Sequence, residues 1–399
     1  MAEYKGTIAI LTGGGDVPGL NPAIRAVTIR ALREDYRVLG IKRGWAGLVD
    51  LVPEKGADNS RCIQELKWDV VNRAGRTGGT FLHTSRTRPS HLPRALMPPH
   101  LQDRYTDDVN DITPTVLENL EFLGVDYLIP IGGDDTLSYG HRLHKEGFKV
   151  VAIPKTMDND VPGTDYCIGF STCITRTIEL THKLRTTAGS HERLLVIEVF
   201  GRYAGFTALM PTMAAAADRC VIPEHPFAIE KLAELLIEDR NHHPSHYAVV
   251  LVSEGAVMTH DEGMHFKSNE VDQYGHKKLG GIGDKVAEAL KEISPQFNQG
   301  RRVNVVNQRL GYLVRCGDPD ALDSIVPMAF GNLALDLVLE GTSGRLISMR
   351  NGIYDSVPID LVVGRKKIID VEKYYNTERL RPKYESFNRR PLFIMTADE

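Results

Sequence analysis

Short apolar runs alternate with polar, glycine-rich turns along most of the chain. The runs lie at about 7–11, 38–41, 127–131, 150–153, 194–199, 247–252 and 303–306. Runs of this length, bounded by turns, are typical of buried strands in a parallel sheet. Helices are predicted at about 21–33, 113–123, 171–185, 214–217, 284–293 and 321–339. The order of strands and helices favours an α/β fold.

The first apolar run is followed by a glycine-rich turn at 12–20. Asn21 is then predicted to be the N-cap of a helix, with Pro22 at the first helical position. The strand at 38–41 completes a βαβ unit with a phosphate-sized cradle at the helix N-terminus. The spacing is not the dinucleotide pattern G-x-G-x-x-G, and a glycine turn alone can equally serve a structural need.

Two later runs each end in a turn that carries carboxylates. Residues 132–136 read GGDDT, and residues 154–160 read PKTMDND. If the strands at 127–131 and 150–153 are parallel neighbours, both turns lie at the carboxyl edge of the sheet, where open α/β folds bind ligands. Asp134 could then face a hard cation such as Mg²⁺ through oxygen.

The second acidic turn combines an ammonium with two carboxylates. Lys155 precedes Asp158 and Asp160, which are two residues apart. This combination suits metal-assisted proton abstraction beside a phosphate. An isolated Asp-x-Asp is just as often a solvated turn, and the functional interpretation depends on the two acidic turns sharing one edge.

Composition excludes several classes of function. The 399 residues are 42% hydrophobic and 25% charged, with a formal net charge of −4, as in soluble globular proteins. No overall basic field attracts nucleic acid or an anionic membrane. The N-terminus does not resemble a signal peptide, and no apolar stretch approaches the ~20 residues of a membrane span. The length corresponds to two or three domains or to one bilobed enzyme.

Neither the cysteines nor the clustered histidines predict a metal site. The five cysteines are an odd number without a Cys-x-x-Cys pair, which favours reduced thiols in a cytoplasmic protein. His242, His243 and His246 lie in a polar stretch with Pro244, which we interpret as a solvated turn.

Arginines accompany two further glycine turns. Residues 78–88 hold a second glycine turn followed by Arg86 and Arg88, and the proline-rich residues 89–111 are predicted to form a long loop, of the kind that often acts as a lid. The strand at 194–199 ends in Phe-Gly-Arg, and Arg202 can reach a phosphate or carboxylate with two hydrogen bonds. The strand at 247–252 ends in Ser-Glu-Gly, and the polar residues 256–280 are predicted to form a hairpin excursion.

Five motifs, taken together and in this order, resemble those of the phosphofructokinase family over most of the chain. They lie at 14–21, 132–134, 154–160, 190–193 and 201–205, and read GGDVPGLN, GGD, PKTMDND, SHER and GRYAG. The resemblance implies phosphoryl transfer to the 1-hydroxyl of fructose 6-phosphate. It also implies two Rossmann-like lobes with parallel-type central sheets and an active site in the cleft between them.

The resemblance also implies roles for individual residues. Asp158 resembles the general base, and Arg202 resembles the residue that stabilises the transferring phosphoryl group. Thr156, the third residue implied to be catalytic, resembles the residue that contacts the sugar. The remaining implied roles are substrate binding by Arg193 (reaching a neighbouring subunit), Phe200, Gly201, Glu254, Tyr312 and Arg315, donor binding by Gly14, Arg86, Asp135 and Lys155, and Mg²⁺ binding by Asp134 and Asp160.

Two positions bear on the phosphoryl donor. Many ATP-dependent members have glycine where this chain has Asp135 and Lys155, so the chain resembles the pyrophosphate-dependent branch. Asp135 would put a side chain and a negative charge where an ATP α-phosphate must lie. Like charges ~4 Å apart repel by roughly 4 kcal/mol at an effective dielectric of ~20, which is about three decades of affinity. Lys155 would offset the charge of pyrophosphate, with Mg²⁺ carrying the rest.

One motif departs from the family pattern. The family commonly has Gly-His-x-Gln-Arg-Gly-Gly near the sugar phosphate, and residues 311–317 read GYLVRCG instead. Tyr312 and Arg315 remain candidates for binding the sugar phosphate. The family also has an arginine shortly upstream, for which both Arg302 and Arg309 are candidates.

The resemblance therefore implies reversible transfer between pyrophosphate and fructose 6-phosphate in a cytoplasmic homodimer or homotetramer that binds neither nucleic acid nor membrane. The donor lobe is expected at 1–168 plus about 314–360, and the sugar-phosphate lobe at 169–313 plus about 361–399. An ATP-dependent phosphofructokinase is the alternative enzyme, and a lipid or NAD kinase shares only the GGD turn. A catalytically silent regulatory subunit is the alternative of another class.

Overall fold

The chain folds into two compact units, each with its own sheet. The computed structural model describes residues 4–259, 263–264, 266–271 and 277–387. Unit 1 comprises Met1–Thr156, Val161–Gly169 and Cys316–Arg365, and unit 2 comprises Met157–Asp160, Phe170–Arg315 and Lys366–Glu399. The short segment Met157–Asp160 thus groups with unit 2, although the strand before it belongs to unit 1. Both sheets are rich in parallel pairs, which confirms the predicted α/β class.

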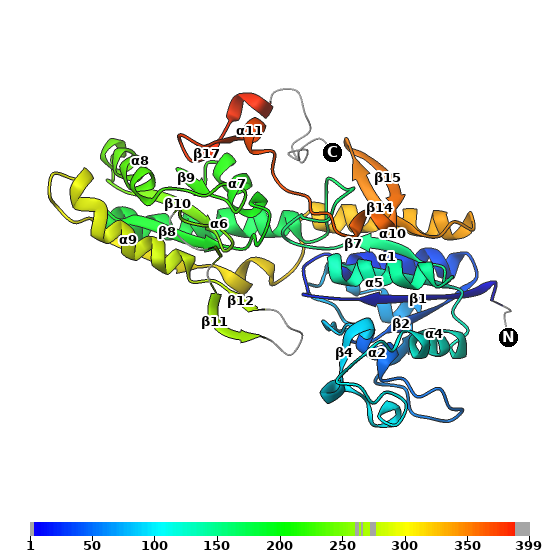
Figure 1. The fold of residues 1–399 in the computed structure, drawn as a ribbon. Coiled ribbons are helices and arrows are strands. Elements are labelled where there is room, and N and C mark those ends of the chain that lie inside the picture. Colours follow the sequence, from blue (N-terminus) through cyan, green and yellow to red (C-terminus); the bar gives the residue numbers. More distant parts are fainter. Residues whose placement is uncertain (1–3, 260–262, 265, 272–276, 388–399) are drawn as a thin grey trace. The chain divides into compact units, whose positions relative to one another are not determined.

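Unit 1 is built on a seven-stranded sheet in the order β15-β14-β7-β6-β1-β2-β3. Figure 1 labels β1, β2, β7, β14 and β15 of this sheet. Its strands are β1 Gly6–Thr12, β2 Tyr36–Ile41, β3 Ile63–Glu65, β6 Tyr127–Gly132, β7 Val151–Pro154, β14 Arg345–Arg350 and β15 Ile353–Pro358. The five central strands run parallel, and the edge strands β3 and β15 pair antiparallel. The residues of β1, β6 and β7 are almost all buried, as their uninterrupted apolar runs predict.

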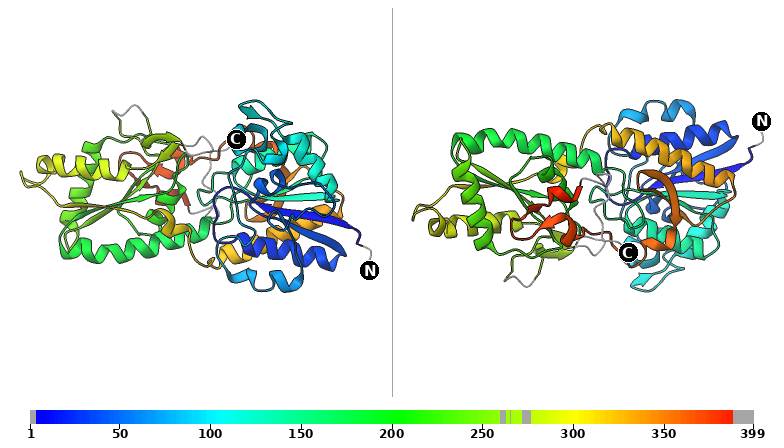
Figure 2. Two further views of the ribbon diagram at one scale, coloured as in Figure 1. Left: turned by 90° about the horizontal axis from the view of Figure 1, so that it is seen from below. Right: turned by 90° about the horizontal axis from the view of Figure 1, so that it is seen from above.

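Helices cover both faces of this sheet. They are α1 Leu20–Arg33, α2 Trp45–Val49, α3 Trp68–Val71, α4 Thr113–Phe122, α5 Asp134–Lys145 and α10 Leu322–Leu339. Side chains of α2, α4 and α5 share one apolar cluster with alternate strand residues such as Ala9, Leu11 and Leu128. Helices α1 and α10 pack against each other, and α10 also packs on β7 and β14. Figure 2 shows helices on either side of the strands in each unit.

Helix α10 is long and apolar enough to cross a membrane by length and composition alone. Its 18 residues have a mean hydropathy of 1.5, and half of them are buried within the protein. Asp323 in its first turn is fully buried and accepts hydrogen bonds from the Tyr166 hydroxyl and from Gly169 N, both at 2.7 Å. A buried, hydrogen-bonded carboxylate and packing against α1 are features of a core helix, which is how we interpret α10.

The N-terminus of α1 differs from the sequence-based prediction. The helix begins at Leu20, and Gly19, with φ 108°, takes the cap position predicted for Asn21. Pro22 is therefore the third helical residue rather than the first. The Asn21 amide instead donates to Thr77 Oγ1 at 2.9 Å and to Thr77 O at 3.2 Å. The cap prediction is wrong because this amide makes a tertiary contact to the second glycine turn.

Residues 89–111 are not the long loop that their prolines predict. They contain β4 Leu92–Pro93, which pairs antiparallel with β5 Val109–Asn110, and the 3₁₀ helices η2 Pro89–His91, η3 Arg94–Leu96 and η4 Pro99–Leu101. A small apolar cluster of Val49, Leu92, Met97, Leu101 and Ile112 lies beneath them. These apolar residues are scattered among prolines, so no strand or helix period reveals that the segment is packed.

Unit 2 contains a four-stranded parallel sheet in the order β13-β8-β10-β9. Its strands are β8 Leu194–Val199, β9 Arg219–Val221, β10 Ala248–Ser253 and β13 Val305–Arg309, and its helices are α6 Phe170–Ser190, α7 Phe206–Met213, α8 Ile229–His242, α9 Ile282–Phe297 and α11 Val371–Tyr374. The predicted hairpin excursion is confirmed by β11 Phe266–Val271, which pairs antiparallel with β12 Lys277–Leu279. A second small pair joins β16 Tyr375–Asn376 to β17 Arg381–Pro382.

The predicted helix at 214–217 is wrong. Helix α7 ends at Met213 with Ala214 as its C-cap, and Ala215 has a left-handed φ of 58°, which stops the helix. Ala216 and Ala217 are nonetheless buried, so these alanines pack in the core from a turn.

Candidate active site

Three turns lie side by side at the carboxyl edge of the unit 1 sheet. Strands β1, β6 and β7 are parallel neighbours, with Ile131 of β6 opposite Ile153 of β7. Lys155 N donates to Gly132 O at 2.9 Å, so the backbone hydrogen bonding between β6 and β7 continues to the residue after β7. The parallel pairing that the sequence analysis required of the two acidic turns is confirmed.

Glycine is required at two of these strand ends by one threonine of α5. A Cβ added to Gly13 would lie 2.3 Å from Thr136 Oγ1, and one added to Gly132 would lie 2.4 Å from Thr136 Cβ. No side chain fits at either position, so only glycine allows the close approach. Thr136 is almost fully buried and joins the first glycine turn to the start of α5, where Asp134 lies.

The ammonium of Lys155 lies against the first glycine turn. Lys155 is only 4% exposed, and its Nζ donates to Gly15 O at 2.7 Å. A Cβ added to Gly14, whose φ is 79°, would be 3.4 Å from that nitrogen. A buried ammonium near the N-terminus of α1 concentrates positive charge where an anion would meet the backbone amides.

The second glycine turn packs against the first. Gly14 N donates to Ser85 O at 2.9 Å, and the Thr84 hydroxyl donates to Gly14 O at 2.7 Å. Asn21 holds the same turn from the α1 side, where its Oδ1 accepts from Phe81 N at 3.0 Å. The predicted donor residue Arg86 follows these contacts directly and is exposed.

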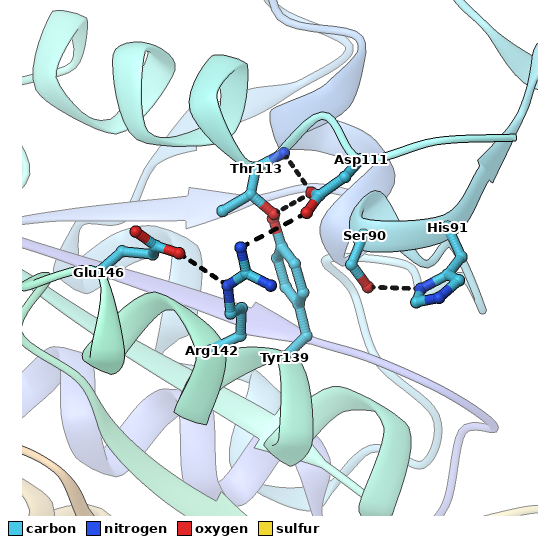
Figure 3. Close-up of polar contacts among 7 residues, drawn as sticks. All are labelled: Ser90, His91, Asp111, Thr113, Tyr139, Arg142 and Glu146. Atoms are coloured by element: carbon cyan, nitrogen blue, oxygen red, sulfur yellow. Dashed lines mark hydrogen bonds and ion pairs between the residues drawn. The ribbon is translucent and has the colours of Figure 1, made fainter. Parts of the chain in front are cut away.

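A polar network anchors α5 to the start of α4 (Figure 3). The Tyr139 hydroxyl donates to Thr113 Oγ1 at 3.2 Å, and the Thr113 hydroxyl donates to Asp111 at 2.5 Å. Arg142 ion-pairs with Asp111 at 3.5 Å and with Glu146 at 2.8 Å. Burial raises the pKa of Tyr139, which keeps its hydroxyl protonated. The network therefore fixes the helix whose first two residues are the acidic pair.

Asp135, the second residue of α5, is paired with an arginine. One terminal nitrogen of Arg88 donates to both carboxylate oxygens of Asp135, each at 2.9 Å. Sequence reasoning considered the charge of Asp135 alone. The pairing joins residues 47 positions apart, so the turn itself carries no signal of it.

In unit 2, the turns after β8 and β10 also lie side by side. The two strands pair in parallel, and Gly255 N donates to Gly201 O at 3.1 Å. A Cβ added to Gly255 would lie 2.0 Å from Arg202 O, so the turns require glycine at this contact. The predicted residues Phe200, Gly201, Arg202 and Glu254 thus meet at one edge of this sheet.

Glu224 braces the turn that carries Arg202, and sequence reasoning missed it. Its two carboxylate oxygens accept from Gly205 N at 3.0 and 3.1 Å, and one of them also accepts from Ile369 N at 2.9 Å. Burial raises the pKa of Glu224, whereas these amide hydrogen bonds lower it. The Ile369 segment also reaches the acidic loop, because Lys367 N donates to Asp160 O at 3.1 Å.

Arg302 and Arg309, the two candidates for the family's upstream arginine, have different surroundings in the structure. Arg309 Nε donates to Glu198 Oε1 at 2.6 Å, and the other oxygen of Glu198 accepts from Gly281 N and Gly283 N at 3.1 and 2.9 Å. Arg302 is exposed before β13. Arg309 is therefore tied to a buried carboxylate of β8, whereas Arg302 is at the surface.

Asp158 lies in a field of unit 2 charges. Burial raises its pKa well above the usual value, and the negative charges of Asp160 and Glu254 raise it further, while Arg315 and Arg202 act in the opposite direction. Burial also raises the pKa of Glu254 to about 7, against the effect of Arg202. A carboxyl group with a raised pKa is a stronger base when it is ionised, which suits a proton acceptor.

Arg193 lies at the opposite end of β8 from the Arg202 turn. It directly precedes Leu194, whereas Gly201 follows the carboxyl end of this six-residue strand. A strand of that length spans roughly 20 Å. Its strand therefore does not bring Arg193 to the edge that carries the other predicted sugar residues of the same chain.

Tyr312 and Arg315 lie on the 3₁₀ helix η5 Gly311–Arg315. Tyr312 is 73% exposed, and Arg315 is only 8% exposed with its guanidinium carbon 5.8 Å from the Tyr312 ring centre. The predicted Thr156 closes unit 1 at the boundary with Met157–Asp160.

Among the described residues, no three Asp, Glu, His or Cys side chains converge as a ready-made metal site. The predicted Mg²⁺ residue Asp134 belongs to unit 1 and Asp160 to unit 2. His242 ends α8, and the ring of His243 lies 4.1 Å from that of Tyr247, in keeping with the interpretation of a surface turn. All five cysteines are free in the structure.

Comparison with known proteins gives relatives over nearly the whole chain. The family model described as phosphofructokinase matches residues 7–338. A pyrophosphate–fructose 6-phosphate 1-phosphotransferase of Dictyoglomus thermophilum is 36% identical over 377 residues, covering 93% of this chain and 97% of the relative. An ATP-dependent 6-phosphofructokinase of Mycobacterium bovis is 34% identical over 369 residues, covering 92% and 97%. Relatives named for either donor are thus similarly close.

Solved structures share the fold. A pyrophosphate-dependent phosphofructokinase from Marinobacter aquaeolei superposes with a TM-score of 0.71 at 18% identity, covering 95% of this chain and 89% of that one. A phosphofructokinase from Pichia pastoris superposes with a TM-score of 0.72 at 28% identity. The match covers 90% of this chain and 36% of the Pichia chain, so this chain spans about a third of that length.

Proposed function

Because the chain belongs to the phosphofructokinase family, it is a phosphofructokinase that acts on fructose 6-phosphate, and we propose that its phosphoryl donor is pyrophosphate. The reaction is then the reversible transfer of a phosphoryl group to the 1-hydroxyl, giving fructose 1,6-bisphosphate and phosphate. The observation that carries the donor proposal is the buried Lys155 ammonium, 2.7 Å from Gly15 O beside the first glycine turn. A fixed ammonium there offsets the concentrated charge of a diphosphate.

Asp135 supports the same donor for a reason that the structure modifies. Its side chain occupies the first turn of α5, next to Asp134. The repulsion of roughly 4 kcal/mol expected for a bare carboxylate is an overstatement, because Arg88 donates to Asp135 at 2.9 Å. The volume of the two paired side chains is then the larger obstacle to a longer donor.

We assign the proton transfer to Asp158, as base for the 1-hydroxyl, with Thr156 as a neighbouring sugar contact. The raised pKa of Asp158 supports this role, since a general base works best when its pKa approaches the operating pH. Arg202 is assigned to the charge of the transferring phosphoryl group, for which a guanidinium offers two parallel hydrogen bonds.

Substrate binding is assigned to residues of both sheet edges. The sugar phosphate is assigned to Phe200, Gly201, Glu254, Tyr312 and Arg315, together with Arg193 from a neighbouring subunit of a homodimer or homotetramer, and the donor to Gly14, Arg86, Asp135 and Lys155. The position of Arg193 at the far end of β8 supports its action on another subunit.

Mg²⁺ fits the carboxylates that the chain offers. This ion usually takes one or two protein carboxylates and completes its octahedron with substrate phosphates and water. Asp134 is the proposed ligand at the donor turn and Asp160 the second candidate, and a ready-made cluster of three ligands is not needed for such an ion. When bound, Mg²⁺ would neutralise part of the pyrophosphate charge and polarise the phosphoryl group.

The test is a donor comparison on the purified chain, which we expect to be a cytoplasmic enzyme. The ratio kcat/KM is measured for pyrophosphate and for ATP with fructose 6-phosphate and Mg²⁺, and the Asp158→Asn variant gives the background rate. A parent enzyme that prefers ATP would overturn the donor proposal in favour of the ATP-dependent alternative. The 34% identity to the Mycobacterium bovis enzyme supports that alternative. No turnover with either donor would instead indicate a regulatory subunit.

A further inference from the structure

Two residues from distant parts of unit 1 form an ion pair next to the donor turns. Arg88 directly precedes η2, and Asp135 is the second residue of α5. One terminal nitrogen of Arg88 donates to both oxygens of Asp135 at 2.9 Å each. The turn before Arg88 packs on Gly14 through the Thr84 hydroxyl, and Gly14 lies beside Lys155. The pair therefore joins the segment that packs on the first glycine turn to the start of α5, which follows the Gly132 that accepts from Lys155 N.

Stability does not account for this pair. The side chains of Arg88 and Asp135 are 41% and 58% exposed, and ion pairs this exposed contribute little to folding. Helix α5 is already fixed by the hydrogen bond of Tyr139 to Thr113 and by the packing of Thr136 against Gly132. The effect of the pair consequently falls on the charge and the free space at the donor edge.

We propose that Arg88 and Asp135 determine donor choice as one unit, and that Arg88 is a latent ligand for the additional phosphate of a nucleotide. A guanidinium binds carboxylates and phosphates through the same N–H groups. Asp135 therefore occupies on Arg88 the place that an α-phosphate would take. This inference rests on the proposed function and specifies how the same site rejects a nucleoside triphosphate.

The two donors differ in what they demand of the pair. Pyrophosphate has no further phosphate and leaves the contact between Arg88 and Asp135 intact. ATP must displace the carboxylate from Arg88, and its α-phosphate then meets the negative charge of Asp135. The effect of Arg88 on ATP thus depends on Asp135: Arg88 is occupied by the carboxylate when Asp135 is present, and it attracts ATP when Asp135 is absent.

A double-mutant cycle tests this dependence. The kcat and KM for both donors are measured on the parent, Arg88→Gln, Asp135→Gly and the double variant. We expect Asp135→Gly to raise kcat/KM for ATP by about 10- to 100-fold, a change on the scale of one charge-assisted contact. Adding Arg88→Gln should remove most of that gain, mainly through the KM for ATP. Gains that are equal with and without Arg88 would overturn the proposal, because the two positions would then act independently.

Two further variants separate charge, geometry and volume. Asp135→Asn keeps the size of the side chain and removes its charge. This variant should use ATP better than the parent only if freeing Arg88 from the carboxylate is enough to admit ATP, without any loss of side-chain volume. Arg88→Lys in the Asp135→Gly background keeps the positive charge without the planar fork, and should retain part of the ATP activity. If Arg88→Lys and Arg88→Gln are equally inactive with ATP in this background, the bidentate geometry is essential; if both are as active as Asp135→Gly alone, Arg88 is not a ligand.

Arg104 provides a matched control within unit 1. It forms a similarly exposed ion pair with Glu118 of α4, its NH1 2.5 Å from Oε2 and the two side chains 46% and 51% exposed. Arg104→Gln should leave the kinetics of both donors unchanged, and thermal unfolding midpoints check that every variant is folded. A parent that prefers ATP contradicts the pyrophosphate proposal, whereas independent effects of Arg88 and Asp135 contradict this inference. The donor preference of the parent therefore tests the proposed function, and the double-mutant cycle tests the inference.

Discussion

Glu198 of β8 and Arg309 of β13 form an ion pair in which Nε lies 2.6 Å from Oε1. Glu198 is 3% exposed, and its second oxygen is bound by the backbone amides at the start of α9. The pair therefore joins two neighbouring strands and one helix of unit 2 around a single buried carboxylate. Breaking a buried pair on one side leaves an uncompensated charge, which is strongly destabilising.

Arg309→Met should therefore lower the free energy of unfolding by about 3 kcal/mol. The exposed Arg302 is the matched control, and Arg302→Met should change stability by less than ~0.5 kcal/mol. Urea unfolding at neutral pH measures both. Equal stability of the two variants would show that Glu198 does not depend on Arg309.

The strands that lead into the acidic and arginine turns could be predicted because each is a largely apolar run, as in β1, β6 and β10. Strands β9 and β14 were not predicted, and β14, which reads RLISMR, is not an apolar run. Apolar and polar residues do not alternate in the apolar runs, because both faces of those strands are buried. The length of the apolar run and the glycines that flank it are sufficient to identify the strand. The turn chemistry follows directly from those strand ends, so Gly132, Asp134 and Lys155 were located by sequence alone. The N-cap at Asn21 was wrong because an amide that can cap a helix can equally bind a distant turn.

The supporting residues could not be predicted, because their partners are remote in the sequence. Glu224 meets Ile369, which is 145 positions away, and Asp135 meets Arg88 across 47. No local period or spacing encodes such contacts. The sequence therefore predicts the turns at the strand ends, whereas the structure was needed to find the groups that hold or neutralise the residues of those turns.

The raised pKa of Glu254 predicts a stability that falls as the pH rises. Its usual value is 4.5, and burial raises the pKa to about 7, so the folded protein holds this proton more tightly than the unfolded chain. The free energy of unfolding should then decrease between about pH 4.5 and 7, by about 3 kcal/mol from this group alone. Glu254→Gln should flatten that decrease relative to the parent. Parallel pH profiles of the two proteins would contradict the assignment.

Asp158→Asn should lower kcat by about 10²- to 10⁴-fold in both directions while changing KM much less. The reason is that the variant keeps the size of the side chain and loses the proton acceptor. Rapid mixing of enzyme with both substrates, followed by product analysis, measures the chemical step directly. A kcat close to that of the parent would remove Asp158 from the role of base.

Arg193→Ala tests whether the sugar phosphate site uses a second subunit. The KM for fructose 6-phosphate should rise by about 10- to 100-fold, the scale of one charge-assisted contact, and the KM for pyrophosphate should change little. Hybrids of Arg193→Ala with Asp158→Asn should recover activity, because one of the shared sites then has both native residues. Hybrids that form, as shown by mass spectrometry, but stay inactive would mean that each site uses one chain.

Lys155→Met tests the charge beside the first glycine turn. The side chain is 4% exposed, and Met keeps most of its length, so the variant removes the ammonium without a large cavity. The ratio kcat/KM for pyrophosphate should fall by about 10²- to 10³-fold, as expected when a fixed donor to a reacting anion is lost, while the KM for fructose 6-phosphate stays near that of the parent. Lys149→Met is the control, since Lys149 is exposed before β7, with its Nζ 5.0 Å from the Tyr127 ring centre. If both variants lose the same activity, the loss reflects the packing of β7 rather than the charge at its carboxyl end, and Lys155 has no special part in donor binding.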